Sequence, residues 1–230
     1  MRDAIQIAGI HDLEEAELVI ACGVEFLGFP LRLKDAREDL TEQAARTIVS
    51  AVCGRVECVA ITYLADAREI AELADFLRVG WVQLHGAMAS SELAGLRRIR
   101  PHLKVIKSLV VSGDDPRQQL IDQISRLCDH VDAFIADTYD PATGRSGATG
   151  KVHDWNVSRQ LVAQSPKPVI LAGGLRADNV ATAIGQVRPA AVDAHTGVEG
   201  SGARKDSARL QAFVETARKA FGRVAVGADV

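Results

Sequence analysis

Short apolar runs alternate with longer segments in which apolar residues recur every three or four positions. Continuous apolar runs are typical of strands buried on both faces, and the longer period is typical of helices that cover such a sheet. The pattern predicts a repeated strand-then-helix unit along the whole chain. The expected strands are residues 4–9, 25–29, 56–62, 81–84, 103–108, 133–136, 169–172 and 191–193.

Helix starts are marked by side chains that can accept hydrogen bonds from the free N–H groups of a first turn. The expected caps are Asp12, Thr41, Asp154 and either Ser90 or Ser91. Pro116 suits the first turn of a helix, where no N–H group is needed. The last helix is expected over residues 207–221.

This order of elements predicts an α/β fold: one parallel (β/α)8 TIM barrel over residues 1–223, with a flexible tail at 224–230. A doubly wound open sheet is the alternative, because the same alternation builds both folds. A dinucleotide-binding sheet would carry Gly-x-Gly-x-x-Gly after its first strand. That motif is absent there, which favours the barrel.

Composition narrows the classes of partner. The 230 residues are 47% hydrophobic and 25% charged, enough for one sizeable core, and the net charge of −3 argues against nucleic acid as the main partner. No apolar run approaches the roughly 20 residues that cross a bilayer. The chain starts directly with a strand pattern, so a cytoplasmic protein is expected. The four cysteines, Cys22, Cys53, Cys58 and Cys128, do not have the paired spacing that is typical of metal-binding sites.

Two late apolar runs stop at glycine, one at Gly173-Gly174 and the next at Thr196-Gly197. Glycine lets the backbone approach a ligand closely, and free N–H groups at such turns can bind an anion. An ordinary strand-to-helix turn is the alternative for either pair alone. Two in succession near the end of a barrel predict a phosphate site, because (β/α)8 barrels often bind phosphate there.

Active sites of such barrels lie at the carboxyl ends of the strands, where His85, Asp137 and Asp193 are expected. Asp137 follows an apolar run, so burial could raise its pKa and make it a general acid, or it could serve as a cap or ion-pair partner. Asp193 would repel a phosphate and is expected to hydrogen-bond backbone groups or substrate hydroxyls.

The longest loop, residues 138–151, contains Gly147 and is interpreted as a lid or anion-wrapping segment, or as a disordered excursion. Arg37 lies in the loop after the second strand. Its guanidinium group could pair with a carboxylate or phosphate, or simply be solvated.

A series of motifs in the same order along almost the whole chain resembles the phosphoribosylanthranilate isomerase family of tryptophan biosynthesis. These motifs are Ile5-Gln6-Ile7-Ala8-Gly9, Val82-Gln83-Leu84-His85-Gly86, Asp137, Gly147-Ala148-Thr149-Gly150-Lys151, Asp154-Trp155, Leu171-Ala172-Gly173-Gly174-Leu175, Gly197-Val198-Glu199 and Lys205-Asp206.

The resemblance implies an Amadori rearrangement without metal or cofactor, on a small phosphorylated sugar substrate, by a monomer or homodimer. It implies that Asp137 is the general acid on the ring oxygen, and that a cysteine ending the first strand takes the C2 proton. It further implies that Arg37 contacts the anthranilate end of the substrate. The phosphate would be held by Gly173, Gly174, Thr196 and Gly197, with His85, Gly147 and Asp193 as further substrate-binding residues.

The chain departs from the family pattern at the point of chemistry. Where the family reads Lys-Ile-Cys-Gly, this chain reads Gln6-Ile7-Ala8-Gly9, and a methyl group cannot accept a proton. The small polar pair that the family pattern has after Asp193 is instead His195-Thr196. The imidazole of His195 is a candidate replacement base or a phosphate ligand. The segment before Arg37 has also changed. A single change at Ala8 would fit an engineered inactivation, whereas several together indicate a natural paralogue.

Three hypotheses follow. The first is a phosphoribosylanthranilate isomerase in which another base, with His195 the candidate, replaces the cysteine. The second is a repurposed enzyme for another phosphoribosyl or sugar-phosphate compound, which keeps Asp137 and the phosphate turns. The third is a barrel that binds a phosphorylated ligand without catalysis.

Overall fold

The computed structural model describes residues 1–33, 38–112, 116–140, 145–146 and 152–227. Two residues expected to bind substrate, Arg37 and Gly147, lie outside these ranges, as do the last residues of the expected tail. Their roles therefore stay predictions.

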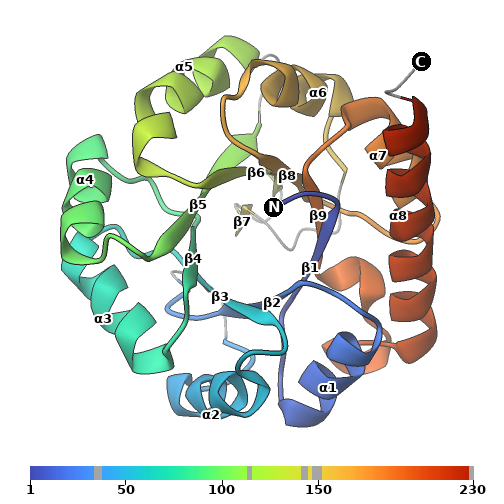
Figure 1. The fold of residues 1–230 in the computed structure, drawn as a ribbon, viewed down its shortest axis with the longest axis horizontal. Helices are drawn as coiled ribbons and strands as arrows, with labels where there is room; N and C mark the ends of the chain where they lie inside the picture. Colours follow the sequence, from blue (N-terminus) through green and yellow to red (C-terminus); the bar gives the residue numbers. More distant parts are fainter. Residues whose placement is uncertain (34–37, 113–115, 141–144, 147–151, 228–230) are drawn as a thin grey trace.

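The described chain forms a closed ring of parallel strands surrounded by helices, as Figure 1 shows. Neighbouring strands follow the order β5-β4-β3-β2-β1-β9-β8-β6, and β5 pairs with β6 to close the ring. The predicted (β/α)8 TIM barrel is confirmed, and the open sheet is wrong. The barrel strands are β1 (Ala4–Ala8), β2 (Phe26–Pro30), β3 (Glu57–Thr62), β4 (Trp81–Leu84), β5 (Lys104–Val111), β6 (Ala133–Asp140), β8 (Val169–Leu171) and β9 (Ala191–Ala194).

Helices follow the strands and cover the outside of the ring. They are α1 (Leu13–Ala21), α2 (Glu42–Val52), α3 (Ala67–Leu77), α4 (Ser90–Ile99), α5 (Arg117–Leu127), α6 (Trp155–Gln164), α7 (Val180–Val187) and α8 (Ser207–Gly227). Short 3-10 helices are η1 (Cys128–His130), η2 (Thr196–Val198) and η3 (Ser201–Ala203).

The predicted caps are partly confirmed. The side chains of Asp12, Thr41 and Asp154 each accept a hydrogen bond from an N–H group in the first turn of the helix that follows. The cap expected at Ser90 or Ser91 is wrong, because both residues already lie inside α4 and its preceding residue makes no side-chain cap. Helix α8 continues to Gly227, past the predicted end at residue 221.

Side chains alternate between the two faces of the barrel wall. One set packs with the helices in the larger apolar core, and the other fills the barrel interior. The interior set is Ala4, Ala8, Phe26, Val59, Ile61, Ile106, Ala133, Ile135, Ile170, Ala172 and Ala191. Alanines at the carboxyl ends of β1 and β8 leave room there for polar groups.

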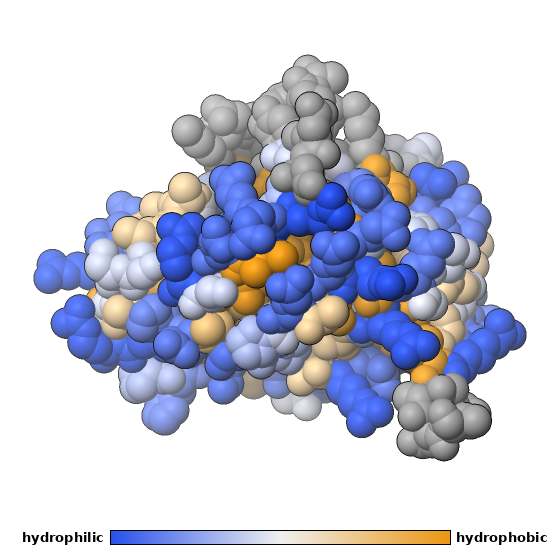
Figure 2. Space-filling view, turned by 90° about the horizontal axis from the view of Figure 1, so that it is seen from above, coloured by the Kyte–Doolittle hydropathy of each residue, from blue (hydrophilic) through white to orange (hydrophobic). Residues whose placement is uncertain are grey.

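The loop expected after residue 137 starts as strand. β6 runs on to Asp140 and pairs antiparallel with β7 (Arg145–Ser146). On the face shown in Figure 2, hydrophilic residues dominate and hydrophobic residues form small areas between them. Every helix in the described residues is too short or too polar to cross a lipid bilayer.

Candidate active site

Asp137 and Asp193 lie inside the barrel near the carboxyl ends of their strands. Interior Ile135 precedes Asp137 by two positions and interior Ala191 precedes Asp193 by two, so both carboxyl groups share the inward direction of these core residues. Their exposed fractions are only 4% and 9%. The alternation of β6 and β9 thus places two acids within the same enclosed space.

Burial keeps these acids from ionising readily. It raises the pKa of Asp137 to about 6, although the Thr138 N–H group, which donates to Oδ1 at 2.7 Å, acts in the opposite direction. The pKa of Asp193 rises to about 7, first through burial and then through the charge of Asp137; Gln6 and Lys205 oppose this rise. Such a pair retains a proton near neutral pH, as a general acid requires.

Two buried amides connect Asp193 to His85. Gln6 Nε2 donates to Asp193 Oδ1 at 2.9 Å and to Gln83 Oε1 at 2.8 Å, and Gln83 Nε2 lies 2.8 Å from His85 Nε2. Sequence reasoning did not select these two glutamines as site residues. In the sequence, each glutamine is a polar residue within an otherwise apolar strand, and this was the available signal. In the fold, β1 and β9 pair Gln6 with Asp193.

His85 is a neutral donor at this site. Burial, together with the charge of Lys107, lowers the pKa of His85 to about 3. The Gln83 amide donates to Nε2, so the ring proton resides on Nδ1. Nδ1 is buried and has no partner among the described residues. An N–H group in this state can donate to a bound substrate, and it cannot accept a proton.

The two glycine turns lie against each other. Gly173 and Gly174 have φ values of 87° and 61°, in the left-handed region that favours glycine. A Cβ atom on Gly197 would lie 1.8 Å from the Leu175 carbonyl oxygen, so the second turn touches the first. Within the described chain, the N–H groups of Gly173, Gly174, Thr196 and Gly197 donate to no other residue. These N–H groups lie on two adjoining turns, which is the arrangement expected of an anion site.

The first glycine turn does not lead directly into a helix. Helix α7 begins at Val180. The intervening Asn179 holds the turn: its Oδ1 accepts from the Arg176 N–H group at 2.8 Å, and its Nδ2 donates to the Gly174 carbonyl at 3.0 Å. The turn itself, rather than a helix end, presents the free N–H groups.

A second histidine, missed in the sequence, lies beside the same turn. His153 Nδ1 is 2.9 Å from Thr138 Oγ1, and its Nε2 is 2.6 Å from Ser158 Oγ. A Cβ atom on Gly173 would lie 2.0 Å from Thr138 Oγ1. Burial lowers the pKa of His153 to about 4, against the opposing charge of Asp154. This neutral ring ties the end of β6 to α6, and its contacts explain why position 173 must be glycine.

His195, directly after β9, lies against the end of β1. A Cβ atom on Gly9 would be 2.1 Å from His195 Nε2, which places the ring next to the residue that follows Ala8. Nε2 is 3.2 Å from Glu199 Oε1, and the Lys205 ammonium is 2.8 Å from the same oxygen. Burial alone would raise the pKa of Glu199, but His195 and Lys205 outweigh it and lower that pKa to about 2.

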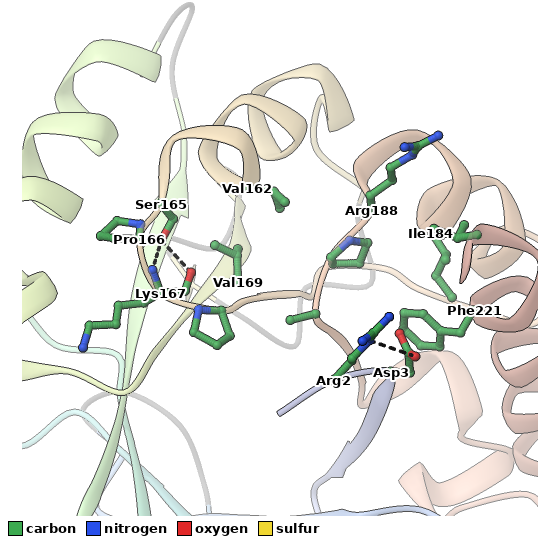
Figure 3. A pocket seen from close by; sticks show the side chains of 14 residues that line it. Arg2, Asp3, Val162, Ser165, Pro166, Lys167, Val169, Ile184, Arg188 and Phe221 are labelled. Carbon is green, nitrogen blue, oxygen red and sulfur yellow. Dashed lines mark hydrogen bonds and ion pairs between the residues drawn. The ribbon is translucent and has the colours of Figure 1, made fainter. Parts of the chain in front are cut away.

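A pocket of about 430 Å³ lies at the opposite end of the barrel, where β8 and β9 begin (Figure 3). Its charged residues do not converge: Arg2 pairs with Asp3 at 3.8 Å, and the side chains of Lys167 and Arg188 point away from each other. The carboxyl-end mouth is therefore the better candidate for the active site. In the described ranges, no three His, Cys, Asp or Glu side chains lie close enough together to hold a metal ion.

A closed parallel barrel with buried acids at the carboxyl ends of its strands is the architecture of a (β/α)8-barrel enzyme. The family described as N-(5'-phosphoribosyl)anthranilate (PRA) isomerase matches residues 5–216. The chain therefore belongs to the PRA isomerase family, which consists of isomerases of tryptophan biosynthesis.

Individual relatives agree over nearly their full lengths. N-(5'-phosphoribosyl)anthranilate isomerase 2 of Methanosarcina mazei is 36% identical over 221 residues, which cover 96% of each chain. The isomerase structure from Thermus thermophilus is 26% identical with a TM-score of 0.78, covering 93% of this chain and 97% of that one. An isomerase structure in complex with reduced 1-(o-carboxyphenylamino)-1-deoxyribulose 5-phosphate is 24% identical with a TM-score of 0.77, covering 94% and 98%.

Proposed function

We propose that this member of the family catalyses the Amadori rearrangement of N-(5'-phosphoribosyl)anthranilate with Asp137 as general acid and His195 as general base. The observation that carries the proposal is the buried carboxyl group of Asp137 inside the barrel mouth, whose pKa is raised by burial to about 6, so that its proton is within reach at a pH slightly below neutral. Family membership supports the reaction, and the geometry supports the two roles.

The first step opens the ribose ring. Asp137 donates its proton to the ring oxygen, the C1–O bond breaks, and the anthranilate nitrogen lone pair forms the C1=N bond of a protonated Schiff base. The carboxylate left on Asp137 lies near the Thr138 N–H group, which already donates to Oδ1. That hydrogen bond stabilises the charge as it forms.

The second step moves a proton from C2. His195 takes the proton, the C2–H electron pair forms a C1=C2 bond, and the C1=N pair returns to nitrogen. The resulting enolamine becomes the 1-deoxyribulose product when C1 gains a proton and the C2 hydroxyl loses one, which converts the C1=C2 bond and the C2–OH group into a C2 carbonyl. Ala8 offers no proton acceptor, whereas the imidazole of His195 reaches the same strand end through its contact with Gly9.

Substrate would be held at both ends. The four free N–H groups at Gly173, Gly174, Thr196 and Gly197 suit a phosphate. We expect His85 Nδ1 and the carboxyl group of Asp193 to bind the sugar, Arg37 to contact the anthranilate end, and Gly147 to belong to the lid. A related isomerase has been solved with a reduced deoxyribulose 5-phosphate product analogue, which is the ligand chemistry proposed for this mouth.

The alternatives are a repurposed enzyme for another phosphoribosyl or sugar-phosphate compound and a non-catalytic phosphate-binding barrel. Family membership over residues 5–216 favours the isomerase over both. A catalytic role for Asp137 also explains why this acid is buried with no cationic partner in contact among the described residues, which a simple binding barrel would not need.

Loss of N-(5'-phosphoribosyl)anthranilate fluorescence tests the proposal. The purified protein should consume the substrate well above the rate in buffer, and Asp137→Asn should reduce kcat by about a hundred- to ten-thousand-fold. Folded protein that leaves the substrate unchanged would overturn the isomerase reading. Turnover that survives Asp137→Asn would overturn the role of Asp137.

A further inference from the structure

Three side chains after β9 form a connected line from the protein interior to the barrel mouth. The Lys205 ammonium is fully buried, with 0% of its side chain exposed, and it pairs with Glu199, which is 10% exposed. Glu199 Oε1 also contacts His195 Nε2, and His195 is 20% exposed. Exposure therefore increases stepwise from the cation through the carboxylate to the imidazole.

The line is anchored at its inner end. The Lys205 N–H group donates to Glu15 Oε1 at 2.7 Å, and its ammonium lies 3.5 Å from the His195 carbonyl oxygen. Glu199 and Lys205 also form a backbone bridge that closes the segment between them. The ion pair with Lys205 and the backbone bridge both favour this position of the Glu199 carboxylate beside the imidazole.

The contact selects one nitrogen of the imidazole. Nε2 faces Glu199, and Nδ1 has no hydrogen-bond partner among the described residues. A carboxylate that accepts one ring N–H leaves the other nitrogen unprotonated and able to accept a proton. It also stabilises the imidazolium that forms when that proton arrives.

We propose that Glu199, fixed by Lys205, is a positioning residue that holds the proton of His195 on Nε2 and keeps Nδ1 as the acceptor for the C2 proton. The inference rests on the proposed function, because it presumes that His195 is the base. When Nδ1 takes the proton, the C2–H pair forms the C1=C2 bond and the new imidazolium pairs with Glu199.

The test compares Glu199→Gln and Glu199→Asp with His195→Ala in the fluorescence assay. Glu199→Gln should lower kcat about 10- to 100-fold with KM within about three-fold, and Glu199→Asp should recover part of the loss. His195→Ala should lose about a hundred-fold or more. Glu14→Gln is the matched control, because Glu14 is exposed on α1 and should keep full activity.

Nitrogen-15 spectra of the histidine rings give a second measurement that a merely structural role would not change. The unaltered protein should show the Nε2–H tautomer for His195, and Glu199→Gln should shift the population toward Nδ1–H. If Glu199→Gln unfolds the protein by leaving the Lys205 ammonium unpaired, the double variant Glu199→Gln/Lys205→Met removes both charges and keeps the test.

The outcomes separate the two levels of inference. An inactive but folded unaltered protein overturns the proposed function. Activity that survives His195→Ala overturns both the base and its positioning. The third outcome is that His195→Ala loses activity while Glu199→Gln keeps full kcat and an unchanged His195 tautomer. That outcome overturns the positioning role of Glu199 alone and leaves the proposed isomerase activity intact.

Discussion

Replacement of Gly9 by alanine should displace the imidazole of His195, the candidate base, without changing the chemistry of that side chain. A Cβ atom there would lie 2.1 Å from His195 Nε2. Favourable non-bonded contacts lie near 3.5 Å, so the ring must retreat by about 1 Å or more. A displacement of that size in a catalytic group costs about a hundred-fold in rate.

A matched variant isolates this displacement from backbone strain. Gly9 has φ +76° and Gly23 has φ +79°, and a Cβ atom on Gly23 would meet nothing within 4 Å. Alanine in the left-handed region costs about 1–2 kcal/mol at either site, or roughly 2–8 °C in Tm for a domain of this size. Only Gly9→Ala pushes on His195.

The assay is kcat/KM from substrate fluorescence, with Tm measured on the same samples. We expect similar losses of Tm for Gly9→Ala and Gly23→Ala, and a loss of activity of about a hundred-fold only for Gly9→Ala. Equal activity in the two variants would refute the placement of the base at His195.

Three further outcomes follow from the same structure. The pKa of Asp137 is raised to about 6, above the ordinary value of 3.8, so its ionisation destabilises the folded state as pH rises through 6. Asp137→Asn should therefore increase the free energy of unfolding by up to about 3 kcal/mol at pH 8 and change it little at pH 4, measured by urea unfolding. Gly197→Ala should raise KM about ten-fold or more, because its Cβ atom would lie 1.8 Å from the Leu175 carbonyl; Gly185→Ala, where space is free, should not change KM. Inorganic phosphate at ten times its Kd should stabilise the unaltered protein by about 1.4 kcal/mol in a thermal shift assay, and an equal shift in Gly197→Ala would contradict the phosphate site.

The barrel was predictable because its signal is local. A strand buried on both faces needs a continuous apolar run, so each run identified its strand within a few residues. The hairpin of β6 with β7 was not predictable, since Tyr139 pairs with Ser146 across a polar loop that has no apolar pattern. The end of α8 was missed because small residues after Phe221 also suit a loose tail.

Parts of the candidate site followed from the same local signals, and others did not. Asp137 and the glycine turns stood out at strand ends. The hydrogen bonds of Gln6 depend on which strands are neighbours and in what register, and its contact with Asp193 joins residues 187 positions apart. The contacts of His153 with two hydroxyl groups, and the ion pair of Lys205 with Glu199, likewise arise only when the chain has folded.

Barrel topology also explains why the candidate base is found on β9. A base that serves in place of a cysteine at Ala8 is most directly supplied by an adjacent strand, and β1 pairs with β2 and β9. At the level of Ala8, β2 presents Gly28, where a Cβ atom would lie 2.7 Å from Ile61 and 3.0 Å from Ala8, so no side chain fits there. On the other side, β9 ends beside Gly9, and glycine at that position leaves space for an imidazole. Ala8 and His195 therefore lie at the same end of the barrel, which is the arrangement that the proposal of His195 as the base requires.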